Sequence, residues 1–311
     1  MLFEVSGVEI HPLIPPLVAL LVSTFTSTSG VSGGFLLLPF QVSFLGFTSP
    51  AVSSTNQLYN IVSIPSGVLK YIREGRMVWP LTWIVVAGTL PGVLIGALIR
   101  INFLSDPKVF KIFAGFVLLY IGIKLVTDIL SKKNNNSSED RFQELVKSHS
   151  KSQGDEKLKL PRSKVKKFNL KELVYEFYGE SYRVPTISMF IISFIVGIIG
   201  GAYGIGGGAI IAPVYIAFYK LPVYTVAGPA LMGTFLTSIA GVIFYQILSL
   251  FYTNTAIAPD WTLGMLFGVG GFVGMYIGAS IQKHIPAKII KWLLGLCILF
   301  LAINYIFVVF K

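Results

Sequence analysis

The chain has 311 residues, of which 54% are hydrophobic and 13% charged, and its mean hydropathy is +0.74. Since a soluble domain carries about 25% charged residues, this chain has too little polar surface to coat a water-soluble globule of its size. The composition excludes most soluble enzymes and nucleic-acid-binding proteins, and it predicts a polytopic membrane protein.

The net charge of +11 has a local origin. Of the 25 basic residues, 13 lie between Lys132 and Arg183, together with 8 acidic residues. A basic stretch beside a membrane is typical of the cytoplasmic side, where it meets anionic lipid, so nucleic acid is not expected as a partner. The single cysteine, Cys297, excludes an intrachain disulfide and a Cys-rich metal site. Residues 1–11 lack the basic residues of a cleavable signal peptide, so the first apolar segment is expected to be retained.

Ten apolar segments are predicted, five on each side of the basic stretch, because about 20 apolar residues cross the hydrocarbon core as a helix. Those of the first half span roughly residues 12–29, 31–48, 51–72, 79–101 and 108–131. Those of the second half span roughly residues 185–203, 205–220, 223–252, 261–282 and 287–310. The first two of each half are short and interrupted by glycines. The sequence leaves open whether those segments cross the membrane or form re-entrant hairpins.

A glycine-rich motif occurs once in each half. An offset of 174 residues relates the members of the first motif, Gly30, Gly33, Gly34 and Pro39, to those of the second, Gly204, Gly207, Gly208 and Pro213. The same offset pairs Gly67 with Gly241 and Tyr71 with Tyr245, and an offset of 182 pairs Gly92 and Gly96 with Gly274 and Gly278. An ordered series of this kind predicts an internal duplication. Five segments per half would invert the second copy relative to the first.

Three parts of the chain are therefore predicted: a first membrane repeat over 1–131, a basic cytoplasmic linker over 132–184 and a second membrane repeat over 185–311. The composition of residues 132–150 predicts disorder. Residues 170–178 carry Leu, Val, Phe and Tyr at helical spacing. That spacing predicts either a helix lying on the cytoplasmic membrane surface or a soluble segment that caps the bundle.

The distribution of basic residues predicts the orientation. Lys70, Arg73 and Arg76 lie in one loop that faces the cytoplasm if the linker does, and both termini then lie outside. One loop, with Arg100, Lys108 and Lys111 nearby, disagrees with that assignment. The balance favours a multi-pass protein of the plasma membrane with its termini outside.

The paired glycine motifs indicate a binding site. Adjacent glycines leave the backbone bare, and a helix that restarts after such a break presents free N–H groups to an anion. Inverted repeats with broken helices near the midplane are typical of secondary transporters. The alternative is tight helix packing of the Gly-x-x-x-Gly kind.

The inventory of charges favours an anionic or neutral substrate. Outside the linker every acidic residue is predicted near a segment end: Glu4, Glu9, Glu74, Asp106, Asp128 and Asp260. Cation carriers usually place a carboxylate at mid-depth. Arg100, Lys111 and Lys124 could attract anions, but each is predicted near a segment end, where it is expected instead to extend its charge to the membrane surface. No catalytic set, metal site or cofactor is expected, so the protein is not predicted to be an enzyme.

The third segment is unusually polar, and Asn56, Asn60 and Ser63 form one helical stripe on it. Side-chain amides can donate hydrogen bonds to an oxyanion, although hydrogen bonding between helices is an alternative use for them. The predicted substrate-binding residues are Gly30, Gly33, Gly34, Asn56, Asn60, Gly204, Gly207, Gly208 and Thr234.

These motifs resemble the sulfite exporter TauE/SafE family, also called the toluenesulfonate uptake permeases. The resemblance covers both membrane halves, including the glycine motifs that end at Pro39 and Pro213 and the stretch from Ala51 to Gly96. It implies a secondary transporter of small sulfur-containing anions, such as sulfite or organosulfonates. Ser32 stands where the family commonly has a third glycine, Asn56 stands near a Gly-Thr-Ser of the family, and the linker is long.

Two other functions stay open on the sequence: a passive anion channel, and a scaffold or signalling membrane protein that uses the basic linker. The sequence also leaves open the particular sulfur compound, the coupling ion, the direction of transport and whether the chain forms a homo-oligomer.

Overall fold

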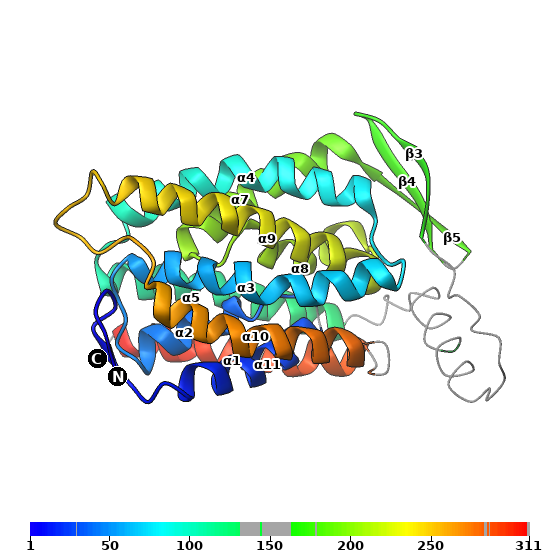
Figure 1. Cartoon of the computed structure of the whole chain (residues 1–311). Helices are drawn as coiled ribbons and strands as arrows, with labels where there is room; N and C mark the ends of the chain where they lie inside the picture. Colours follow the sequence, from blue (N-terminus) through cyan, green and yellow to red (C-terminus); the bar gives the residue numbers. More distant parts are fainter. Residues whose placement is uncertain are drawn as a thin grey trace.

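A computed structural model describes residues 1–28, 30–130, 144, 163–177, 179–282, 285 and 287–309 of the chain. These residues form a long bundle of helices with a small β-sheet at one end (Figure 1). The helices of the first half are α1 (Ile14–Ser27), α2 (Gly34–Ser43), α3 (Ala51–Arg73), α4 (Trp79–Asn102) and α5 (Pro107–Leu130). Those of the second half are α7 (Thr186–Tyr203), the 3-10 helix η1 (Gly207–Ile210), α8 (Ile211–Tyr219), α9 (Val223–Leu248), α10 (Trp261–Ile281) and α11 (Ala287–Val309).

The helical membrane class is confirmed. Each predicted apolar segment contains a helix within the described residues, and its ends differ from the predicted ones by a few residues. In that part of the chain α4, α7, α9 and α10 are each long and apolar enough to cross a membrane. The described residues also form strands, which an all-α description omits: β1 (Leu2–Phe3), β2 (Val8–Glu9), β3 (Lys164–Phe168), β4 (Glu172–Phe177) and β5 (Glu180–Pro185).

The helix pair α1–α2 begins and ends at the same end of the bundle. The Ser6 hydroxyl donates to the Asp260 carboxylate over 2.8 Å, and the Ala51 N–H donates to the Ala256 carbonyl over 3.0 Å. We call this end, marked by Ser6, Ala51 and Asp260, the N-terminal end, and we call the end with β3–β5 the sheet end (Figure 1). Helices of 14 and 10 residues are about 21 and 15 Å long, short of the roughly 30 Å hydrocarbon core. The first pair is therefore a hairpin that dips into the bundle.

The pair α7–α8 is a second hairpin, entered from the sheet end. Ser188 lies in the first turn of α7 and Tyr219 is the last residue of α8, and their hydroxyl oxygens are 2.7 Å apart. The chain therefore returns to the end from which α7 starts. The two hairpins enter the bundle from opposite ends.

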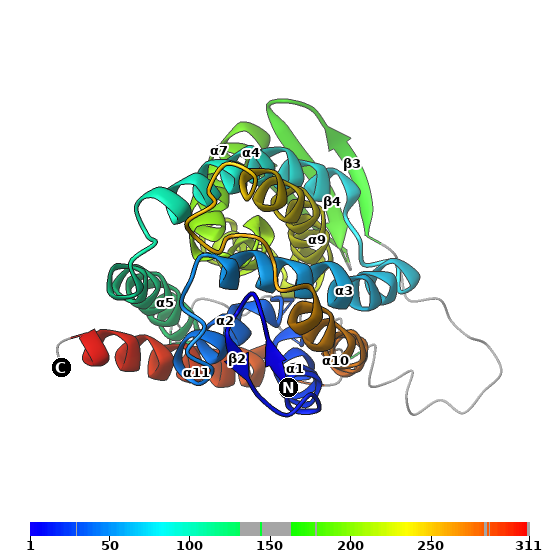
Figure 2. The same ribbon diagram turned by 60° about the vertical axis from the view of Figure 1, so that its left-hand side comes forward.

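The helices form two groups on either side of α3 (Figure 2). One group contains α4, α7 and α9, and the other contains α1, α2 and α10, while α5 and α11 lie together on one flank. This arrangement leaves α3 in contact with elements of both halves. Its polar side chains are buried for that reason.

Glycine seams join each hairpin to a long helix of the other half. On α4, a Cβ added at Gly88 would lie 2.8 Å from a backbone carbonyl oxygen of α7, and a Cβ added at Gly92 would lie 2.5 Å from the carbonyl oxygen one turn later. A Cβ added at Gly96 would overlap a third carbonyl oxygen of α7. On α10, Gly270, Gly274 and Gly278 face α1 carbonyls just as closely. The helices approach too closely there for any side chain, which is the small-residue packing described for membrane helices. The carbonyls that meet α4 belong to Phe190, Phe194 and Ile198, and those that meet α10 belong to Pro16, Leu20 and Thr24.

The linker contains a sheet where the helical spacing predicts a helix, so that prediction is wrong. Strands β3, β4 and β5 are antiparallel in that order, with Tyr175 opposite Tyr182. Along β4, Leu173, Tyr175 and Phe177 are buried, while the residues between them are half-buried. The spacing of the apolar residues is compatible with the helical period of 3.6 and with the strand period of 2. The packing of Leu173, Tyr175 and Phe177 on one face of the sheet shows that the strand period applies here.

The sheet is attached to the bundle. The Tyr175 hydroxyl lies 2.9 Å from the Thr225 hydroxyl of α9, and both side chains are buried. The prediction of disorder for 132–150 falls outside the described residues, apart from Glu144. The boundaries of the three predicted parts stay predictions.

Candidate functional site

Both glycine breaks lie against the N-terminal half of α3. The first lies between α1 and α2 and the second between α7 and η1. Gly204 ends α7 with φ +86°, and Gly206 follows with φ +82°, a region that favours glycine. The second motif therefore needs glycine at these positions to turn the chain between the two helices.

Asn56 connects the two breaks. Its side chain is fully buried, and its amide N–H groups donate to the carbonyls of Gly34 and Gly204, each over 3.0 Å. Its amide oxygen accepts a hydrogen bond from the Gln41 side chain over 3.3 Å. One side chain on α3 thus ties the start of α2 to the end of α7, although these elements are far apart in the sequence.

Asn60 makes a second connection, one turn further along α3. Its amide nitrogen donates to the Ile205 carbonyl over 3.0 Å and to the Ser238 hydroxyl over 3.3 Å. Its oxygen accepts from the Ser32 hydroxyl, which itself accepts from the Gly34 N–H over 3.1 Å. In this conformation both predicted amide donors are bonded to the protein. The alternative of hydrogen bonding between helices accounts for these contacts.

The remaining predicted glycines make close backbone contacts. A Cβ at Gly33 would overlap the Tyr59 hydroxyl, which is 2.6 Å from the Ser23 hydroxyl. The Gly207 N–H donates to the Thr237 hydroxyl over 3.2 Å. A Cβ at Gly208 would overlap the Ala230 carbonyl. Gly33 therefore packs on α3, while Gly207 and Gly208 bring the second break against α9 as well as α3.

Thr234 and Gly30 lie at the edge of this cluster. The Thr234 hydroxyl donates to the Ala230 carbonyl of its own helix over 2.9 Å, and a Cβ at Gly208 would lie 2.7 Å from that hydroxyl oxygen. Gly30 has φ +73° and packs against Ala227, two turns from Thr234 along α9. The nine predicted residues thus lie in or beside the two breaks, with Thr234 and Gly30, itself part of the first break, at the edge of the cluster.

Arg100 is buried, so the prediction that its side chain extends to the membrane surface is wrong. Its exposed fraction is 0%. The guanidinium donates from Nε to the Ser53 hydroxyl over 3.3 Å, from one terminal nitrogen to the Thr48 carbonyl over 3.2 Å and from the other to the Leu104 carbonyl. It also lies 3.8 Å from the centre of the Phe110 ring. The loops before α3 and after α4 fold over the side chain and exclude it from the surface.

Gln57 is a buried polar side chain that the predicted set omits. It is fully buried on α3, and neither of its amide atoms has a hydrogen-bond partner among the described residues. It lies off the stripe of Asn56 and Asn60 and faces Gly241 of α9, where a Cβ would overlap its oxygen. The sequence pairs Gly241 with Gly67 through the offset of 174, but nothing in the sequence indicates which side chain packs against Gly241.

Asp260 and Glu74 have structural partners. Asp260 caps α10 by accepting the Leu263 N–H over 3.0 Å, and Glu74 pairs with Arg76 and with Lys70 at the sheet end. Within the described residues, no group of three His, Cys, Asp or Glu side chains is placed to hold a metal ion.

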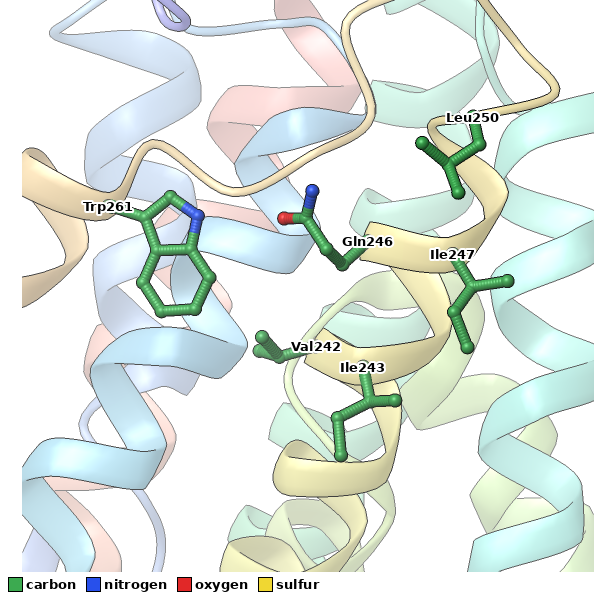
Figure 3. Close-up of a pocket in the computed structure, with 6 residues that line it drawn as sticks. All are labelled: Val242, Ile243, Gln246, Ile247, Leu250 and Trp261. Carbon is green, nitrogen blue, oxygen red and sulfur yellow. The ribbon is translucent and has the colours of Figure 1, made fainter.

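A groove of about 290 Å³ lies elsewhere, between α9 and the start of α10. Figure 3 shows Val242, Ile243, Gln246 and Ile247 of α9 along it, with Leu250 just after the helix and the Trp261 ring across from Gln246. Ile243, Ile247 and Leu250 are exposed there, so the groove opens on the outer face of the bundle. It contains none of the predicted site residues.

Comparison with known proteins gives a consistent result. The sequence matches the family described as Sulfite exporter TauE/SafE over residues 16–305. It is 21% identical over 295 residues to the probable membrane transporter protein YunE of Bacillus subtilis, covering 93% of this chain and 94% of that protein. It is 22% identical over 269 residues to the probable membrane transporter protein MamO of Magnetospirillum gryphiswaldense, covering 84% of this chain but only 39% of that protein. No solved structure matches.

Proposed function

Since the chain belongs to the sulfite exporter TauE/SafE family, we propose that this membrane protein carries small sulfur-containing anions across the plasma membrane by alternating access. The substrates would be sulfite or organosulfonates. The observation that carries the proposal is the pair of hydrogen bonds from Asn56, which reach one glycine break in each half of the chain. A transporter with its site between two repeats needs such a junction, because one repeat moves against the other there.

An inverted duplication is part of this proposal, and the glycine seams support it. The α7 carbonyls that meet α4 belong to residues 190, 194 and 198, each 174 positions after the α1 carbonyls at 16, 20 and 24. The α10 glycines at 270, 274 and 278 lie 182 positions after those of α4 at 88, 92 and 96. Each hairpin therefore packs on the other half through equivalent residues, as a two-fold axis would require. If α3, α4 and α5 cross the membrane in the first half and α9, α10 and α11 in the second, the odd number of crossings per half inverts the second copy.

The proposed binding residues are those predicted around the breaks, with Asn56 and Asn60 as switchable donors. In the present conformation they hold the carbonyls of Gly34, Gly204 and Ile205. Separation of the two halves would break the bonds to residues 204 and 205 and release amide N–H groups for an oxyanion. The anion would replace the carbonyls as acceptor, so the amide N–H groups stay hydrogen-bonded on opening.

For the orientation we propose that the sheet end lies in the cytoplasm and the N-terminal end outside. Lys70, Arg73 and Arg76 are near the sheet end, as the positive-inside rule requires. Strand β3 carries Lys164, Lys166 and Lys167 on its exposed residues, and anionic lipid is the proposed contact of this edge. Lys166 and Lys167 also pair with Glu176 and Glu172, which reduces the net charge that lipid would meet.

The experiment is uptake of radiolabelled sulfite into proteoliposomes, with binding followed by thermal stability in detergent. A ligand that binds only the folded protein stabilises it by RT ln(1 + [L]/Kd), about 2.7 kcal/mol at one hundred times Kd. We expect stabilisation by sulfite and sulfoacetate but not by chloride. Saturable uptake that a gradient of a second ion drives uphill distinguishes a transporter from a passive channel, which runs only downhill.

Two variants test the site. In Gly33→Val and Gly207→Val the new side chains overlap Tyr59 and Thr89, so uptake should be abolished while the protein still inserts in the membrane. Normal uptake in both variants would contradict the assignment of the breaks as the binding site.

A further inference from the structure

Arg100 carries a buried charge that no described carboxylate neutralises. Its three hydrogen-bond acceptors, a hydroxyl and two carbonyls, are neutral, and no ion pair within 4 Å joins it to a described acidic residue. Each terminal nitrogen carries two N–H groups and donates one hydrogen bond to the described protein. A buried unpaired charge is costly, and inside a membrane protein it is by default a candidate for function.

The other buried arginine of the described bundle, Arg76, has the partners expected of a residue that only stabilises the fold. Arg76 is 3% exposed at the sheet end, and it pairs with the Glu74 carboxylate and donates to the Gln282 oxygen over 2.6 Å. Its charge is neutralised by a neighbour two residues away. The offset of 182 that relates the α4 and α10 glycines relates Arg100 to Gln282, so the equivalent position of the other half carries a neutral amide.

Arg100 lies beside the second glycine break. Its Nε bonds to the Ser53 hydroxyl, and a Cβ at Gly204 would overlap that same Ser53 side chain. Gly204 is the residue whose carbonyl Asn56 holds. The positive charge is therefore separated from the junction of the two halves by a single serine.

Gln57 provides the second, independent observation. It lies one helical turn after Ser53 on the same face of α3, and its amide has no partner among the described residues although it is fully buried. It stands directly over Gly241 of α9, between the two halves. A buried amide in which both polar atoms lack a partner in the described protein is free to bond to a ligand or to an ordered water.

We propose that Arg100 and Gln57 bind the oxygens of the transported anion on the N-terminal-end side of the glycine breaks. This inference rests on the proposed function and specifies its substrate contact. The planar guanidinium fork matches two oxygens of a sulfite or sulfonate group, and the Gln57 N–H groups donate to a third oxygen or to the far end of an organosulfonate. Arg100 supplies the charge that the neutral backbone N–H groups of the breaks lack.

The test measures sulfite and sulfoacetate binding to the full chain in detergent by isothermal titration, for the wild type and for R100Q, R100K, Q57L and R76Q. R100Q and Q57L should each weaken binding by about tenfold or more, the effect of losing a hydrogen bond to a charged group. R100K keeps the charge without the fork and should fall between wild type and R100Q. R76Q, the matched control, removes a buried arginine that is already neutralised and should change the affinity by less than about threefold.

Q57L keeps the proposal testable if R100Q does not fold. It replaces an unpaired buried amide with an apolar side chain, so the thermal stability should stay equal or rise while the affinity falls. A purely structural role for Gln57 cannot produce that combination. Wild-type affinity in Q57L and in whichever Arg100 variant folds would overturn the inference and leave the proposed function standing. A wild-type protein that binds neither anion would instead overturn the proposed function, and this inference with it.

Discussion

Replacing Asn56 with leucine should weaken the junction of the two halves. The change removes the donor to the carbonyls of Gly34 and Gly204 and the acceptor for Gln41, all of them buried. Each buried group left without its partner costs about 1–3 kcal/mol. The Gly34 carbonyl keeps the helical donor available in the first turn of α2, so we expect a loss of about 2–4 kcal/mol in the free energy of unfolding.

The neighbouring residue gives a matched control on the same helix. Gln57 is equally buried but has no hydrogen-bond partner among the described residues, so Q57L should change the free energy of unfolding by less than about 1 kcal/mol or raise it. The assay is equilibrium unfolding in mixed detergent micelles, with the two variants and the wild type side by side. A loss below about 1 kcal/mol in N56L, or an equal loss in Q57L, would refute the assignment of the junction to the Asn56 amide.

Three further predictions concern other parts of the molecule. Gly274→Ala should lower the free energy of unfolding by about 1–3 kcal/mol, because the new Cβ overlaps an α1 carbonyl. Gly67→Ala is the control: its Cβ meets the nearest atoms at 3.7 Å, so the change should be neutral or stabilising. Similar melting temperatures for the two variants would contradict the close packing of α10 on α1. The hydrogen bond from Lys167 lowers the pKa of Glu172, so the sheet should lose stability as the pH falls below about 4.3 and through that lowered pKa, and E172Q should flatten the profile of melting temperature against pH. Sulfoacetate should inhibit sulfite uptake at least about tenfold more strongly than taurine, because the taurine ammonium is repelled by Arg100; equal inhibition would argue against this charge as the selectivity element.

The sequence predicts the helical segments and the breaks well because these depend on local chemistry. A run of apolar residues forms a helix in the membrane whatever its neighbours, since the backbone must satisfy its own hydrogen bonds there. Gly204 and Gly206 require the left-handed region of φ, which a turn between two helices imposes locally. The offsets of 174 and 182 seen in the sequence also relate the residues that make the close glycine contacts of α4 with α7 to those that make the contacts of α10 with α1.

The linker shows where local patterning is insufficient. The residues from Leu170 to Phe177 suit a helical stripe, but Leu170 is 79% exposed and Val174 is half-buried, so they share no face. Pairing with β3 and β5 favours the extended conformation. Short apolar patterns are compatible with both periods, and the long-range strand partners decide between them.

The chain by itself determined the class of protein, the segments and the two breaks, because hydropathy and glycine act over a few residues. Only the tertiary structure decided what the polar side chains do. Whether Asn56 donates to an anion or to two carbonyls, and whether Arg100 reaches the surface or stays buried beside Ser53, depends on elements about 50 to 150 residues away. The free energy of a polar group is set by its partners and by the water excluded from it, and neither is encoded in the residues next to it in the chain.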